Sequence, residues 1–157
     1  MVPLRDFSQS HNGWVTSITV NQHRQPNYAY PILTGGEDGY VRYYHYLNGS
    51  NLDLNGRVHN GWIPTIVSTS SQILITGGED GIVKQWHLYN RSLDKDYGKI
   101  HNGWILSMAV STDEHSVFIG GEDGNLVEYN IPRRELTKYY GVIHDRMILS
   151  MVTIHDY

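Results

Sequence analysis

The chain has 157 residues, a net charge of −4 and no cysteine. The lack of cysteine excludes a disulfide framework and thiol chemistry, and the scattered basic residues argue against nucleic-acid or membrane binding, which needs them clustered. Tyr dominates an aromatic content of 11%, and Gly recurs at regular intervals, as is typical of a soluble all-β domain. Residues 1–10 lack the apolar run of a secretory signal, so we expect a cytoplasmic or nuclear protein that is not secreted.

Two short motifs alternate along the chain. His-Asn-Gly-Trp occurs at 11–14, 59–62 and 101–104, and Gly-Gly-Glu-Asp-Gly occurs at 35–39, 77–81 and 120–124. A repeat of 42 to 48 residues is typical of propeller arrays, in which one unit cannot bury its apolar face without a neighbour. We therefore expect one domain over 1–157, with repeats at 11–58, 59–100 and 101–143 and an incomplete fourth from 144.

Each repeat reads as four strands, which we call a, b, c and d in chain order. Strand a is the apolar run after the motif Trp, and strand b runs into the glycines, whose Gly-Glu-Asp-Gly sequence favours a hairpin turn to strand c. Strand d ends at the next repeat's His. The expected a strands are Val15–Val20, Ile63–Thr69 and Ile105–Val110; the b strands are Pro31–Thr34, Ile73–Thr76 and Val117–Ile119; the c strands contain Val41, Val83 and Leu126; the d strands are Leu52–Val58, Leu93–Ile100 and Leu136–Ile143.

Two single strands flank these repeats. Residues 1–10 are expected to supply an outer d strand at about Pro3–Phe7, and Ile148–Ile154 a final a strand. Joining two chains through these strands would leave b and c missing from the shared blade. Closed propellers have about 4–8 blades, so we expect a partial or open propeller of about three and a half blades, whose exposed edges favour self-association.

The ordered pattern resembles the WD repeat, in which a His, a Ser or Thr, an Asp and a Trp form a structural network within each blade. The resemblance implies an all-β, four-stranded antiparallel blade. Ile119 replaces the hydroxyl residue of the third repeat, and Tyr replaces Trp in the first and third. By resemblance, the network residues are His11, Thr34, Asp38, Tyr44, His59, Thr76, Asp80, Trp86, His101, Asp123, Tyr129 and, opening the fourth repeat, His144.

The repeated histidines invite a metal or catalytic interpretation. Histidines on successive blades lie too far apart to share one ion at about 2.0–2.1 Å, and no Ser or Cys nucleophile recurs beside the His and Asp residues. An active site is usually single, whereas this arrangement repeats. We therefore expect no enzyme activity, no metal and no cofactor.

The resemblance also places the d–a and b–c loops at one edge of the blades, called the top face, where such propellers contact partners. A Trp beside a carboxylate suits a Lys or Arg side chain, and three copies would act by multivalency. We expect a scaffold that binds a basic or amphipathic protein segment through Asn12, Trp14, Glu37, Asn60, Trp62, Glu79, Asn102, Trp104 and Glu122.

Several alternatives stay open at this point. The repeated Trp residues could simply cover the apolar top of strand a, since aromatic residues in β-structure are more often packed than exposed to a ligand. Exposed Trp with Asn and Glu would also suit a glycan-binding propeller. An enzyme would need a unique polar site in the loop Asn21–Tyr30, and the chain could be a fragment without a function of its own.

Overall fold

The computed structural model describes residues 11–21, 31–44 and 51–154, which contain twelve β-strands and no helix. No helix long and apolar enough to cross a membrane occurs in this described part. The strands are β1 (Val15–Val20), β2 (Ile32–Gly36), β3 (Tyr40–Tyr44), β4 (Asn51–Arg57), β5 (Thr65–Ser68), β6 (Ile73–Gly77), β7 (Ile82–His87), β8 (Ser92–Lys99), β9 (Ile105–Val110), β10 (Ser116–Gly121), β11 (Asn125–Asn130) and β12 (Glu135–Val142).

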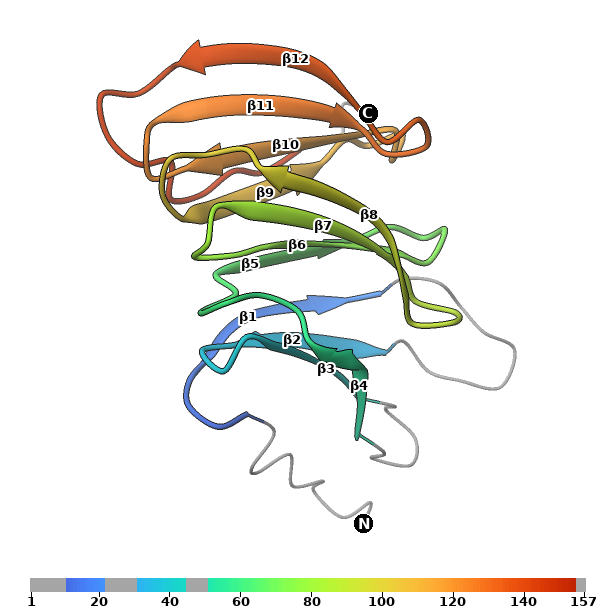
Figure 1. The fold of residues 1–157 in the computed structure, drawn as a ribbon. Coiled ribbons are helices and arrows are strands. Elements are labelled where there is room, and N and C mark those ends of the chain that lie inside the picture. The colour runs from blue at the N-terminus through green and yellow to red at the C-terminus, as the bar shows by residue number, and fades with distance from the viewer. Residues whose placement is uncertain (1–10, 22–30, 45–50, 155–157) are drawn as a thin grey trace.

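The strands form three antiparallel sheets of four, each a simple meander in chain order: β1–β4, β5–β8 and β9–β12. We call these sheets blades 1, 2 and 3. Figure 1 shows them stacked in sequence, from blade 1 near the N-terminus to blade 3. The expected all-β fold of four-stranded blades in an open array is confirmed.

The final expected strand is wrong. Residues 148–154 form no strand, although their sequence parallels that of β9. An isolated strand has no stability of its own, and no described segment pairs with this one as β10 pairs with β9. The expected strand at Pro3–Phe7 and most of the loop Asn21–Tyr30 lie outside the described residues.

The hydrophobic core lies between the blades rather than within any one of them. One cluster fills the junction of blades 1 and 2, and a second fills the junction of blades 2 and 3. The first contains Leu33, Val41, Leu54, Val58, Ile63, Ile66, Leu74, Trp86 and Leu88; the second contains Ile73, Ile75, Val83, Ile105, Met108, Val117, Ile119 and Ile131. Each blade therefore depends on its neighbour for burial, as in other repeat architectures.

The same contact recurs at every junction. The Ile that follows the motif Trp inserts its side chain against a glycine of the preceding blade. A Cβ atom added to Gly35 would lie 2.8 Å from Ile63 Cγ2, and one added to Gly77 would lie 2.8 Å from Ile105 Cβ. After blade 3, Ile148 follows Met147 instead of a Trp but makes the same contact, since a Cβ atom added to Gly120 would lie 2.7 Å from its Cγ2. The Ile backbone also donates a hydrogen bond to the preceding blade, as from Ile63 N to Gly36 O at 3.2 Å. Glycine is needed here because the next blade approaches so closely.

Candidate functional site

The d–a and b–c connections of all three blades meet at one edge, on the left of Figure 1. Within blade 1 the backbone N–H of Glu37 donates to Trp14 O at 2.9 Å, and the Glu37 carboxylate accepts the Trp14 N–H at 3.1 Å. Blades 2 and 3 repeat both contacts, with carboxylate distances of 3.0 and 3.3 Å. The structure thus brings each expected Trp and Glu together, through backbone hydrogen bonds.

The glycine of each His-Asn-Gly-Trp motif makes room for that carboxylate. Gly13, Gly61 and Gly103 have φ values of 125°, 124° and 145°, a backbone conformation that other residues rarely adopt. A Cβ atom at Gly13 would lie 2.7 Å from Glu37 Oε2. The Glu therefore stabilises the loop before strand a, a role that the sequence motif alone does not indicate.

The three motif tryptophans contact one another across the blades. The ring centroids of Trp14 and Trp62 lie 5.6 Å apart with an interplanar angle of 66°, and those of Trp62 and Trp104 lie 5.6 Å apart at 51°. Trp14, at one end, is 70% exposed, whereas Trp62 and Trp104 are partly buried. We call these three residues the tryptophan ladder. The sequence predicted three separate sites, and the structure joins them into one surface.

The motif asparagines stand at the same edge. Asn12, Asn60 and Asn102 are exposed, and their backbone N–H groups donate to the turn carboxylates. The structure thus places each motif asparagine beside the b–c turn of its own blade, through a backbone contact.

The His and Asp residues form the expected pair in each of the three blades. In blade 2 the network is complete: His59 Nδ1 lies 3.0 Å from Asp80 Oδ1, His59 Nε2 lies 2.8 Å from Thr76 Oγ1, and Trp86 Nε1 donates to Thr76 Oγ1 at 3.2 Å. In blade 1, His11 makes the same contacts with Asp38 and Thr34, at 2.9 and 2.8 Å. Tyr44 occupies the Trp position there and is buried.

The network of blade 3 is incomplete. His101 Nδ1 lies 2.8 Å from Asp123 Oδ1, but Ile119 stands where the other blades have Thr, and the buried His101 Nε2 has no hydrogen-bond partner among the described residues. Tyr129 packs against Tyr97 instead, with ring centroids 4.7 Å apart. His144 is exposed and has no Asp partner within the described part of the chain.

The turn aspartates carry fixed negative charge at this edge. Burial alone raises the pKa of Asp123, but hydrogen bonds from His101 and from the backbone N–H groups of Asn102 and Asn125 outweigh it and lower that pKa to about 2. Burial also raises the pKa values of Asp38 and Asp80, but hydrogen bonds from the paired His and from backbone N–H groups outweigh it and lower both. No group of three or more side chains suited to a metal ion occurs in the described ranges.

Four-stranded antiparallel sheets stacked in chain order, with a His–Asp pair at the same edge of each, define blades of a β-propeller. Residues 1–45 and 55–87 match the family described as "WD domain, G-beta repeat". With this fold, the chain belongs to the WD-repeat family. WD repeats generally mediate protein–protein interactions as scaffolds and are typically non-enzymatic.

Two solved structures resemble the chain in fold. The computationally designed Ika4 protein has a TM-score of 0.75 and 20% identity, over 90% of this chain and 81% of that one. The WD40 repeats of RRP9 have a TM-score of 0.80 and 12% identity, over 91% of this chain but only 43% of that one. A search of curated proteins gave no match. At these identities the likeness shows the fold alone.

Proposed function

We propose that the chain is a non-enzymatic scaffold that holds a basic or amphipathic segment of a protein partner along the tryptophan ladder. The observation that carries the proposal is the ladder itself, with three indoles in mutual contact along one edge and Trp14 70% exposed at its end. Exposed Trp is a frequent anchor in protein interfaces because it contributes a large apolar area and a rigid ring.

The charge at this edge favours a basic partner. Glu37, Glu79 and Glu122 each accept the backbone N–H group of a ladder tryptophan, which keeps three carboxylates close to the ladder. A Lys or Arg side chain over an indole gains about 0.5–2 kcal/mol, depending on desolvation. Because the indoles are contiguous, one extended segment crossing several blades fits this surface better than three separate side chains do.

The test is a peptide titration followed by fluorescence anisotropy. The probe is a labelled twelve-residue peptide of Lys and Leu, compared with a peptide in which Gln replaces every Lys. We expect saturable binding of the basic peptide and weaker binding of the neutral one. Trp14→Ala should raise the Kd of the basic peptide about 5–30-fold, the loss of roughly 1–2 kcal/mol.

The matched control is Tyr89→Ala, because Tyr89 is 84% exposed but lies in the turn after β7, away from the ladder. This variant should bind as tightly as the parent chain. Unchanged affinity in a Trp14→Ala protein that retains its β-sheet circular dichroism would refute the proposal. Saturable binding to an oligosaccharide panel, together with indifference to both peptides, would instead support the glycan-binding alternative.

A further inference from the structure

The two end blades each expose an apolar face that the inner junctions bury. We call the face of a blade toward the preceding blade its back face, and the opposite one its front face. On the back face of blade 1, Val15 is 51% exposed, although Ile63 and Ile105, its equivalents in blades 2 and 3, are fully buried. In blades 2 and 3 this face packs into the preceding blade. In blade 1 no segment among the described residues covers it.

The next apolar position of β1 shows the same contrast. Ile18 is 65% exposed, whereas its equivalents Ile66 and Met108 are 5% and 6% exposed. The difference comes from the missing neighbour and not from the residue type. A blade packed on this face would remove both Val15 and Ile18 from water.

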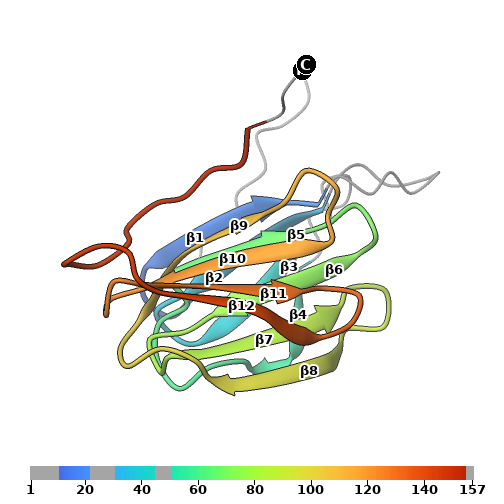
Figure 2. The same cartoon turned by 90° about the horizontal axis from the view of Figure 1, so that it is seen from above.

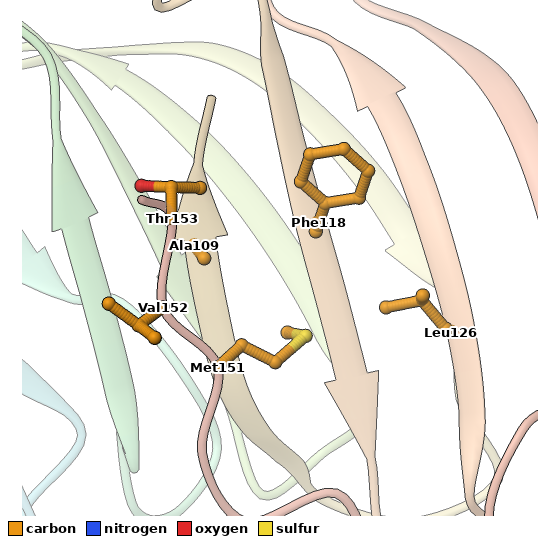
Figure 3. A pocket seen from close by; sticks show the side chains of 6 residues that line it. All are labelled: Ala109, Phe118, Leu126, Met151, Val152 and Thr153. Atoms are coloured by element: carbon orange, nitrogen blue, oxygen red, sulfur yellow. The ribbon is translucent and has the colours of Figure 1, made fainter. Parts of the chain in front are cut away.

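The front face of blade 3 is the face onto which the first strand of a following blade would pack. Phe118 and Leu126 are partly exposed, whereas the equivalent pairs in blades 1 and 2 are fully buried by the next blade: Leu33 with Val41, and Ile75 with Val83. Together with Ala109 and residues 151–153, Phe118 and Leu126 line an open cavity of about 260 Å³ (Figure 3). This face is therefore less completely covered than the front faces of blades 1 and 2.

The segment 148–154 covers only part of the front face of blade 3. Ile148 is buried against Gly120 and donates its backbone N–H to Gly121 O at 3.0 Å. Beyond it, Leu149, Val152 and Ile154 are 67%, 80% and 78% exposed. The segment has none of the strand pairing that fixes β5 and β9 in the inner blades. If it moved aside, Ile148 would lose its place at Gly120, its hydrogen bond to Gly121 O and the one that its carbonyl accepts from Ser107 Oγ at 2.9 Å. The inserting residue of a docked blade would replace these contacts, as Ile63 makes them with Gly35, Gly36 and Ser17.

We propose that blade 1 of a second copy docks with its back face on the front face of blade 3, and that segment 148–154 moves aside to admit it. Val15 of one copy then takes the recess at Gly120 that Ile148 occupies here. A second copy is the fitting occupant because one chain carries both halves of a junction that the fold already makes between its own blades. Two copies joined at both ends would contain six blades, within the usual range for a closed propeller.

This docking differs from closure through a shared blade. Pairing the final and first single strands of two chains would leave strands b and c missing, whereas the head-to-tail junction uses complete blades on both sides. The interface adjoins the peptide surface, because Val15 directly follows Trp14. Ile18 and Leu126, the residues substituted below, lie outside the tryptophan ladder, so their substitution leaves the ladder residues in place.

The test is the solution mass of the full chain by light scattering over a concentration series. The parent chain should approach twice 18.0 kDa. Ile18→Asp disables only the back face, and Leu126→Asp disables only the front face, so each variant alone should be monomeric, with dimer affinity reduced at least about 100-fold. Tyr89→Asp, at an exposed turn, should leave the dimer unchanged.

The decisive step is to mix the two variants. Each keeps one intact face, so a head-to-tail junction predicts that the mixture forms a one-to-one dimer although neither variant dimerises alone. This mixed dimer has one intact junction and is expected to be weaker than the parent dimer, which has two. Circular dichroism confirms beforehand that both variants fold. A parent chain that stays monomeric up to the order of 1 mM, a dimer that withstands both substitutions, or a mixture that stays monomeric would each overturn the proposal.

Discussion

At the scale of single residues, the third blade shows what one substitution does to a repeated network. His11 and His59 each have a Thr hydroxyl 2.8 Å from Nε2, whereas Ile119 leaves His101 Nε2 without a partner among the described residues. A buried polar atom without a hydrogen bond costs about 1–3 kcal/mol. Ile119 offsets part of this cost through its own burial in the junction with blade 2.

We expect Ile119→Thr to be more stable than Ile119→Val by about 1 kcal/mol, since only Thr supplies a hydroxyl to His101. The two variants have nearly the same shape and differ in a hydroxyl that replaces a methyl group, so their comparison measures the hydrogen bond against the cost of burying that hydroxyl. Urea unfolding at equilibrium measures the difference. In an ordinary buried site Val is favoured over Thr, and that order here would mean that His101 Nε2 gains nothing from the hydroxyl.

The His–Asp pairs also set how stability depends on pH. The pKa of Asp123 is about 2 in the folded chain against an ordinary value of 3.8, so the folded state favours the ionised form. Its contribution to stability is therefore present above about pH 4 and is lost as the pH falls toward 2. The pKa values of Asp38 and Asp80 are lowered too, and they add to the same acid-side loss.

Free energies of unfolding measured between pH 2 and 6 should fall toward acid, and Asp123→Asn should make that fall shallower while lowering stability at neutral pH. Glu135→Gln is the control, because Glu135 is exposed on β12 and takes no part in a His–Asp pair. An acid-side slope identical in Asp123→Asn and in the parent chain would contradict this assignment.

At the scale of elements, the apolar runs after the motif Trp predicted the bounds of two of the three a strands correctly, whereas β5 (Thr65–Ser68) is shorter than the expected Ile63–Thr69. The bounds expected for Val15–Val20 and Ile105–Val110 match β1 and β9. The strand expected over Ile148–Ile154 has a similar sequence but is absent, because a strand forms only with a hydrogen-bonded neighbour. Residue pattern alone could not reveal that the partner is missing.

The same difference should appear in the free energy of unfolding when a methyl group is added at a junction glycine. A Cβ atom at Gly77 would lie 2.8 Å from Ile105 Cβ, which the strand β9 holds in place, whereas one at Gly120 would meet Ile148 in a segment without strand pairing. We expect Gly77→Ala to cost about 2–3 kcal/mol and Gly120→Ala under about 1 kcal/mol in urea unfolding. Equal costs would show that segment 148–154 is held as firmly as β9.

At the scale of the whole molecule, stability depends on position in the array as much as on residue type. Ile63 and Val15 occupy the same place in successive repeats, but Ile63 is buried in the junction of blades 1 and 2 while Val15 is 51% exposed. We expect Ile63→Ala to lower the free energy of unfolding by about 3–4 kcal/mol and Val15→Ala by under about 1 kcal/mol.

This comparison is made by urea unfolding at protein concentrations low enough for the chain to be monomeric, so that association does not contribute. The matched pair tests whether blades stabilise each other only through junctions. A large cost for Val15→Ala in the monomer would mean that the back face of blade 1 is covered by a part of the chain outside the described residues.

The repeat, the order of strands a to d and the family could be predicted from the sequence, because they depend on local alternation, turn glycines and a motif repeated at fixed spacing. It also identified the His–Asp pairs, since each lies within one repeat. Which surfaces are exposed to solvent became clear from the packing of the blades. The contacts among Trp14, Trp62 and Trp104, and the open faces at Ile18 and Leu126, depend on how one blade packs on the next. Packing between repeats joins residues about 40 positions apart, and no pattern within a single repeat specifies it.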